Sequence, residues 1–193
     1  MHTITHCINS VTRSGGSDKL GTSPTQTICS AGCLLSSAAM SLKGFGQDFN
    51  PKTLNNWLTN NGGYVSGDLF VWASINRFGL TFKGFISNSR IKENIDAGNV
   101  VIMNVRNGGH WVLATGYSGS STILVNDAGF SVSSYELSQV VDGNTGLYTV
   151  NKIPNFLNNW ILSVQSFISG LTGAEKTNDV PPISIPHEIE NIR

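Results

Sequence analysis

The chain has 193 residues, enough for one domain of ordinary size with a buried core and a terminal appendage, but too few for two full domains. Twelve Lys and Arg residues balance twelve Asp and Glu residues, and charged residues are only 12% of the chain. A protein that binds nucleic acid by neutralising its phosphates carries a basic surplus, so we expect no nucleic-acid partner. The hydrophobic share of 39% excludes a disordered acidic chain.

The beginning of the chain has no targeting pattern. Residues 1–11 lack a basic stretch followed by an apolar core, and no run reaches the roughly 18 consecutive apolar residues of a membrane span. We therefore expect no signal peptide, and a protein that is either cytoplasmic or released without a leader, for example by lysis or by packaging into a particle.

The first half of the chain has the spacing of helices. Residues 1–28 are rich in Ser, Thr and Gly and are expected to form an irregular lead-in. Apolar periodicity and helix-breaking residues then predict four helices, over Cys33–Leu42, Pro51–Leu58, Leu69–Phe78 and Arg90–Ala97. Asp68 is available as the N-cap of the third helix.

Beyond residue 80 the apolar period approaches two and β-branched residues become frequent. The expected strands are Thr81–Ser87, Asn99–Arg106, His110–Ser118, Ser121–Asp127 and Gly146–Lys152. The short glycine turns 107–109 and 119–120 favour antiparallel hairpins. Helices followed by strands indicate an α+β fold, with a helical half packed against an antiparallel sheet.

A boundary is expected at Pro154. Residues 155–171 carry an apolar stripe and no charge, and three later prolines exclude a long helix after Gly173. We therefore divide the chain into a domain over 1–153, an uncharged amphipathic helix over 154–173 and an extended tail over 174–193. The stripe of Asn155–Leu171 and the tail are expected to bind a protein partner or a second copy. Membrane contact is not favoured because the helix has no Lys or Arg.

Three residues have the local context of a hydrolytic site. Cys33 is the first residue of a predicted helix, where unpaired N–H groups and the helix dipole favour a thiolate. His110 opens a strand after the 107–109 turn and is the natural base. Asp127 ends the next strand, so a hairpin at 119–120 would place its carboxylate against the His110 ring, where it could fix the tautomer.

Taken singly, each of these residues has an ordinary structural explanation. A cysteine that begins an apolar helix is commonly a small buried hydrophobe, a strand histidine is commonly structural, and the Asp in Asn-Asp-Ala-Gly is commonly a turn former. Their order and contexts together favour a site built like that of a cysteine hydrolase.

Several motifs between residues 18 and 152 also resemble a known family. They are Leu20-Gly21-Thr22-Ser23, Ala31-Gly32-Cys33-Leu34-Leu35-Ser36-Ser37-Ala38-Ala39-Met40, Phe45-Gly46, Pro51, Leu54-Asn55, Leu58, Asn61-Gly62-Gly63-Tyr64, Gly109-His110-Trp111-Val112 and Val125-Asn126-Asp127. This set resembles the papain-like cysteine peptidases of the bacteriocin-processing, double-glycine-leader type, most of all the free-standing bacterial and phage versions. The resemblance implies a papain-like fold, a triad of Cys33, His110 and Asp127, and amide hydrolysis through a thioester.

One feature departs from the family pattern. The family has a glutamine upstream of the cysteine that helps to bind the oxyanion, and Gln26 and Asn9 are the candidates for this role here. The Leu34-Leu35 pair also stands where the family commonly has Gly-Pro. An inactive descendant is therefore the alternative that the sequence leaves open.

The three cysteines, Cys7, Cys29 and Cys33, are an odd number, so at least one thiol is not paired within the chain. We expect Cys33 to be that thiol and the other two to be bystanders; a Cys29–Cys33 disulfide would block the nucleophile. No local histidine completes a metal-ligand set with the Cys29 and Cys33 pair, so neither a metal nor a cofactor is expected.

The leading hypothesis is a cysteine hydrolase that cleaves an amide bond in a peptide or a peptidoglycan cross-bridge, encoded by a phage and associated with the virion or with lysis. The competing hypothesis is a catalytically inactive structural or interaction protein of a virion or another assembly. That protein would bind its partners through the C-terminal helix and tail.

Overall fold

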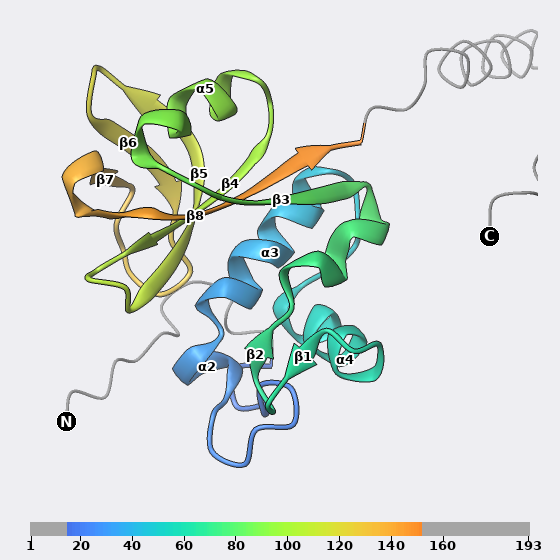
Figure 1. Cartoon of the computed structure of the whole chain (residues 1–193). Helices are drawn as coiled ribbons and strands as arrows, with labels where there is room; N and C mark the ends of the chain where they lie inside the picture. The colour runs from blue at the N-terminus through green and yellow to red at the C-terminus, as the bar shows by residue number, and fades with distance from the viewer. Residues whose placement is uncertain (1–14, 152–193) are drawn as a thin grey trace, which may run out of the picture. The chain divides into compact units, whose positions relative to one another are not determined.

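The computed structural model describes residues 15–151. The expected uncharged helix, the tail and Asn9 therefore lie outside the described residues. In the described range, helices and an antiparallel sheet form one α+β unit, which confirms the predicted fold class (Figure 1). None of the helices between residues 15 and 151 is long and apolar enough to cross a membrane.

The helical half contains α2 (Ile28–Ala31), α3 (Cys33–Gly44) and α4 (Pro51–Asn60). Polar side chains define two of the starting points: Thr27 caps α2, and Asn50 caps α4 ahead of the proline at N1. The predicted helix at Cys33 is present and extends to Gly44. The short helix α2 was not expected, because residues 28–31 lack enough length for an apolar period.

The predicted helix over Leu69–Phe78 is wrong in its first part. A small hairpin forms there, with β1 (Tyr64–Val65) paired to β2 (Leu69–Phe70), and a 3₁₀ segment, η1 (Trp72–Phe78), follows it. Ser66 and Gly67 both have positive φ angles, of 50° and 93°, which reverse the chain. Asp68 consequently lies in the turn of a hairpin rather than at a helix N-cap.

The sheet is antiparallel throughout and has the order β3-β8-β4-β5-β6-β7. Its strands are β3 (Leu80–Ile86), β4 (Val100–Val105), β5 (His110–Ser118), β6 (Thr122–Asn126), β7 (Ser134–Glu136) and β8 (Val140–Val150). The short edge strand β7 was not predicted, and β8 begins six residues before the expected Gly146. The part of β8 before Gly146 contains Gly143, whose φ angle is 69°, and the pairing of β8 with β4 is irregular there.

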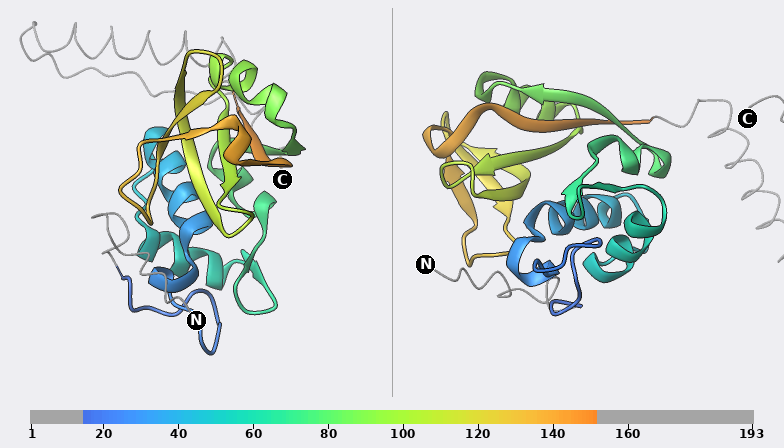
Figure 2. Two further views of the ribbon diagram at one scale, coloured as in Figure 1. Left: turned by 90° about the vertical axis from the view of Figure 1, so that its left-hand side faces the viewer. Right: turned by 60° about the horizontal axis from the view of Figure 1, so that its bottom comes forward.

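Both faces of the sheet are covered. Helix α3 packs on one face, with Leu35, Leu42 and Ile102 in the same buried cluster, and α5 (Ile91–Asp96), which follows the 3₁₀ turn η2 (Asn88–Arg90), packs on the other. Strand β4 lies between these layers and is buried along its whole length. Figures 1 and 2 show α3 running between the sheet and α4, with the helical half on one side of the strands. Small buried residues at Ser36–Ala39 allow this close helix–sheet approach.

Candidate active site

The free thiol of Cys33 stands at the first position of α3. Gly32 separates this helix from α2, and a Cβ at this position would overlap the carbonyl oxygen of Ile28, so glycine is required for the close junction. The N–H groups in the first turn of a helix have no partner within that helix and favour a negative charge beside them. Cys29 is disulfide-bonded, but not to Cys33, so the nucleophile candidate is not blocked.

His110 is the first residue of β5 and is 1% exposed. The preceding turn reverses the chain tightly, with positive φ angles at Asn107 (55°) and Gly108 (90°) and a bond from the Gly109 N–H to the Arg106 carbonyl (3.2 Å). Strand β5 is also tied to the nucleophile helix, because the Ser37 hydroxyl donates to the Trp111 carbonyl (3.3 Å). The imidazole is therefore held at a defined place opposite the beginning of α3.

The structure brings Asp127 against this imidazole. The β5–β6 hairpin pairs Leu113 with Asn126, so the residue after β6 lies beside the beginning of β5. His110 Nε2 and Asp127 Oδ1 are 2.7 Å apart, and both side chains are almost completely buried. Since Nε2 is engaged by the carboxylate, Nδ1 is the ring nitrogen that can serve Cys33.

The imidazole also interacts with the Cys33 side chain. Burial alone would lower the pKa of His110, but the hydrogen bond to Asp127 and the interactions with Asp127 and Cys33 outweigh it and raise the pKa to about 9. His110 is therefore an imidazolium at neutral pH, which places a positive charge beside Cys33. The three residues thus have the connectivity of a nucleophile, a base and an orienting carboxylate.

Further donors surround Asp127. Its Oδ1 accepts from the N–H groups of Gly129 (2.8 Å) and Phe130 (3.0 Å), and its Oδ2 accepts from the Tyr135 hydroxyl (2.9 Å). Burial alone would raise the pKa of Asp127, but the contacts with His110, Gly129 and Tyr135 lower it below its usual value. The carboxylate is thereby kept charged and fixed in orientation.

Sequence reasoning missed the residues behind this carboxylate. Arg106 Nε donates to the Tyr135 hydroxyl (3.1 Å), and the Arg106 guanidinium lies 3.6 Å from the centre of the Phe130 ring. The Phe130 ring in turn meets the His110 ring edge-on, with centroids 4.9 Å apart. Tyr135 lies on the unpredicted strand β7, so no local pattern pointed to it.

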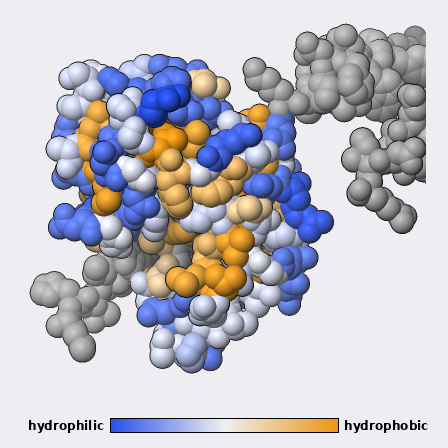
Figure 3. Space-filling model, viewed as in Figure 1, coloured by the Kyte–Doolittle hydropathy of each residue, from blue (hydrophilic) through white to orange (hydrophobic). Residues whose placement is uncertain are grey.

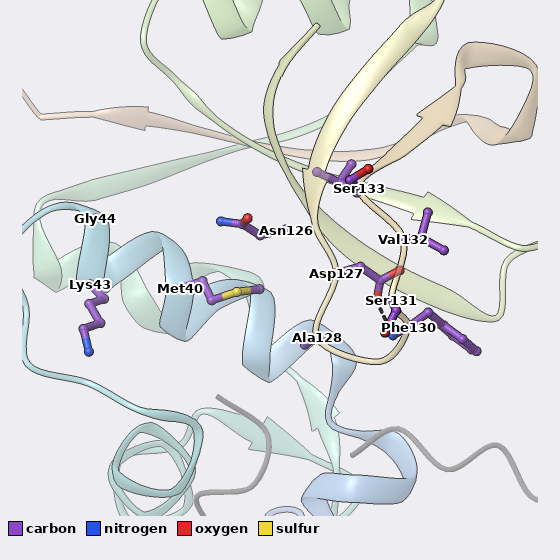
Figure 4. A pocket seen from close by; sticks show the side chains of 11 residues that line it. Met40, Lys43, Gly44, Asn126, Asp127, Ala128, Phe130, Ser131, Val132 and Ser133 are labelled. Atoms are coloured by element: carbon purple, nitrogen blue, oxygen red, sulfur yellow. Dashed lines mark hydrogen bonds between the residues drawn. The ribbon is translucent and has the colours of Figure 1, made fainter. Parts of the chain in front are cut away.

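Cys33 lines a groove of about 310 Å³ between the two halves of the domain. The helical half contributes Leu34 and the β1–β2 hairpin, and the sheet contributes Gly108, Gly109 and Trp111. A larger open pocket of about 730 Å³ is lined by Met40 and Lys43 of α3 and by residues of the segment after β6, including Asp127 (Figure 4). Cys33 does not line this second pocket, so the smaller groove is the candidate substrate site.

The oxyanion candidates have different positions. The side-chain oxygen of Gln26 accepts from the Ser30 hydroxyl (2.9 Å), and Gln26 is not among the residues that line the groove. Asn9 lies outside the described residues, so the second oxyanion donor stays a prediction. Between residues 15 and 151 no group of three or more His, Cys, Asp or Glu side chains could hold a metal ion.

A cysteine at a helix N-terminus, facing a histidine and an aspartate on an antiparallel sheet, defines the class of papain-like cysteine peptidases. The chain matches the Peptidase_C39 like family over residues 19–161, well over half of its length, and it belongs to that family. Comparison with curated proteins and with solved structures gave no significant match.

Proposed function

We propose that this protein is a cysteine peptidase that hydrolyses an amide bond in a peptide or in a peptidoglycan cross-bridge, with Cys33, His110 and Asp127 as its catalytic residues. The observation that carries the proposal is the buried His110–Asp127 pair at 2.7 Å, whose imidazole also interacts with the free thiol of Cys33 at the beginning of α3. Membership of the Peptidase_C39 like family supports the same chemistry.

The reaction proceeds in two halves. The Cys33 thiolate adds to the carbonyl carbon, and the His110 imidazolium gives its proton to the leaving amine as the C–N bond breaks. A thioester remains on Cys33. Neutral His110 then takes a proton from water as the oxygen attacks the thioester, and the carboxylic acid leaves while the thiolate and imidazolium form again. Asp127 stabilises the imidazolium in both halves.

The oxyanion needs hydrogen-bond donors beside Cys33. The backbone N–H of Cys33 is one, because it belongs to the first turn of α3, whose N–H groups have no partner within the helix. The second donor is a side-chain amide, with Gln26 and Asn9 as candidates. Loss of one such donor costs about 100- to 1,000-fold in kcat, so substituting each amide separately identifies the one that is used.

The biological setting is a further part of the proposal. A phage-encoded protein of the virion or of lysis is supported by the resemblance of the Cys33 and His110 motifs to free-standing phage and bacterial versions. The same setting makes peptidoglycan the natural source of the substrate. Residues 155–171 and the tail would bind a protein partner or a second copy.

The test compares the wild-type chain with Cys33→Ala and Cys33→Ser. Hydrolysis of a mixed peptide library is followed by mass spectrometry, and turbidity is followed in a suspension of cell walls. We expect wild-type activity and its loss in both variants, whereas equal activity in all three proteins would refute the proposal. Iodoacetamide labelling at pH 6 is a second measurement: Cys33 should react faster in the wild type than in His110→Gln. A wild-type chain that is inert in all assays would favour the non-catalytic alternative.

A further inference from the structure

The groove beside Cys33 has an uneven distribution of charge. Its lining is mostly apolar or uncharged, with Leu34, Phe70 and Trp111 as the large side chains. The only Asp, Glu, Lys or Arg residue among the described lining residues is Asp68. A carboxylate in a concave apolar site acts through a lower dielectric than it would on an open surface, so its effect on a bound charge is enhanced.

Asp68 is placed by the β1–β2 hairpin. The turn that contains it is held to the lead-in segment, because the Thr22 N–H donates to the Gly67 carbonyl (2.9 Å). Burial is the main cause that raises the pKa of Tyr64, and the negative charge of Asp68 is the second. The Asp68 carboxylate therefore lies close to the Tyr64 ring. The Tyr64 hydroxyl itself donates to Asn55 Oδ1 (2.9 Å) and does not neutralise Asp68.

No cation in the described part of the chain pairs with Asp68. The ion pairs there join Lys52 to Asp18, Arg90 to Glu93, and the two active-site residues. Among residues 15–151, Asp68 therefore presents a half-buried carboxylate to the groove without a cationic side chain as its counter-ion.

The surface next to this carboxylate is apolar. Leu69 and its cross-strand neighbour Val65 are 59% and 55% exposed, although both are aliphatic. Figure 3 shows hydrophobic surface gathered over this hairpin. Exposed apolar side chains at the edge of a groove are typical of a contact surface for a ligand.

These observations match one class of side chain. Lysine and arginine have an apolar stem and a charged end, so the stem can lie against Leu69 and Phe70 while the cation reaches a carboxylate. We propose that Asp68 binds a basic side chain of the peptide substrate, which makes it a specificity-determining residue of the groove. This inference rests on the proposed function of the groove as a peptide site.

The experiment measures binding, so that it does not depend on turnover. The full chain carrying Cys33→Ala is titrated calorimetrically with blocked alanine heptapeptides in which lysine, norleucine or glutamate is moved through every position. Norleucine keeps an apolar stem and lacks the charge. At one position we expect the lysine peptide to bind about two- to fivefold more tightly than the norleucine peptide at low salt, as for a partly exposed ion pair, and the glutamate peptide to bind least.

Substitutions of two aspartates, Asp68 and Asp48, test whether the preference for the lysine peptide depends on Asp68. Asp68→Asn should remove the lysine advantage and Asp68→Lys should shift it to glutamate. The matched control is Asp48→Asn, which removes the same charge from an exposed residue outside the groove and should keep the lysine advantage. In the Cys33→Ala chain that keeps Asp68, the tighter binding of the lysine peptide should also decrease from low to high salt. This measurement needs no substitution of Asp68.

Two results would overturn the inference: lysine binding no more tightly than norleucine at every position, or a lysine advantage that persists in Asp68→Asn. Hydrolysis by the wild-type chain separates this failure from a failure of the proposed function. A chain that cleaves peptides without a lysine preference refutes the role of Asp68 alone. A chain that prefers lysine in binding but cleaves none of the peptides refutes the peptidase proposal and leaves the role of Asp68 standing.

Discussion

At Asp127 both carboxylate oxygens are held, Oδ1 by His110 and two backbone N–H groups and Oδ2 by the Tyr135 hydroxyl. Burial raises the pKa of Tyr135, so its hydroxyl stays a donor. Arg106 donates to that hydroxyl and polarises it, despite a left-handed backbone (φ 55°) that is unusual for a non-glycine residue. We interpret Tyr135 and Arg106 as residues that position the carboxylate.

Tyr135→Phe should lower kcat about tenfold with little change in KM, because it removes one charge-assisted hydrogen bond from Asp127 and no groove contact. Steady-state kinetics on a cleaved peptide check this. Tyr117→Phe is the matched control: its hydroxyl donates from an exposed position of β5 to Asp96 of α5, so its loss should leave kcat unchanged. Equal effects of the two substitutions would contradict the positioning role.

The raised pKa of His110 predicts how stability depends on pH. The folded pKa of about 9 exceeds the ordinary value of 6.5 for histidine, so the interactions of protonated His110 stabilise the fold fully below pH 6.5. This contribution to the stability of the fold declines above pH 6.5 and is lost as the pH rises past about 9. The difference in Tm between the wild type and His110→Gln should therefore be larger at pH 6 than at pH 10. A difference that grows with pH would contradict the assigned direction.

Among the elements, the β1–β2 hairpin depends on one buried side chain of α4. Asn55 is 3% exposed; its Oδ1 accepts from the Gly21 N–H and the Tyr64 hydroxyl, and its Nδ2 donates to the Lys19 carbonyl, each at 2.9 Å. It thus joins the lead-in segment, the helix and the hairpin that forms a wall of the groove.

Asn55→Ala should lower the free energy of unfolding by about 2–4 kcal/mol, because it leaves several buried polar groups without partners. Chemical denaturation measures the change. Asn56→Ala on the exposed side of the same helix is the control and should change the free energy of unfolding by less than about 0.5 kcal/mol. If the two variants were equally stable, the hydrogen bonds of Asn55 would not stabilise the fold, and the prediction would be wrong.

In the whole molecule, Cys33 and its two proposed partners, His110 and Asp127, come from different halves, so the candidate site depends on how these halves pack. Trp72 of η1 lies at the junction. Its ring contacts Phe70 and Trp111 edge-on and stacks with Phe82 and Tyr148. A Cβ at Gly146 of β8 would overlap this ring, so the close approach requires glycine.

Gly146→Ala should therefore destabilise the domain by about 1–3 kcal/mol through overpacking, and it should lower activity by displacing the halves. Gly116→Ala is the matched control in the same sheet, because its added Cβ meets only Leu124 at an ordinary 3.6 Å. Thermal unfolding of both variants provides the comparison. A Gly146→Ala protein as stable as Gly116→Ala would show that the junction can adapt.

Periodicity in the sequence was sufficient for the elements that are long and regular, such as α3, α4 and the β5–β6 hairpin. It failed for the segment 64–78, where apolar residues at helical spacing belong to a hairpin and a 3₁₀ turn. The positive φ angles at Ser66 and Gly67 decide that outcome. It also failed for β7, a strand of three residues that is too short for a period and pairs with β6 at the edge of the sheet.

The sequence by itself determined the α+β class and the proximity of His110 and Asp127, because a short turn joins two neighbouring strands and the register is local. It also placed Cys33 at a helix N-terminus. Only the tertiary structure decided that this helix end faces the imidazole, that Tyr135 and Arg106 support the carboxylate, and that Asp68 lines the same groove. These contacts join residues far apart in the chain, and packing of the two halves, which no local pattern encodes, brings them together.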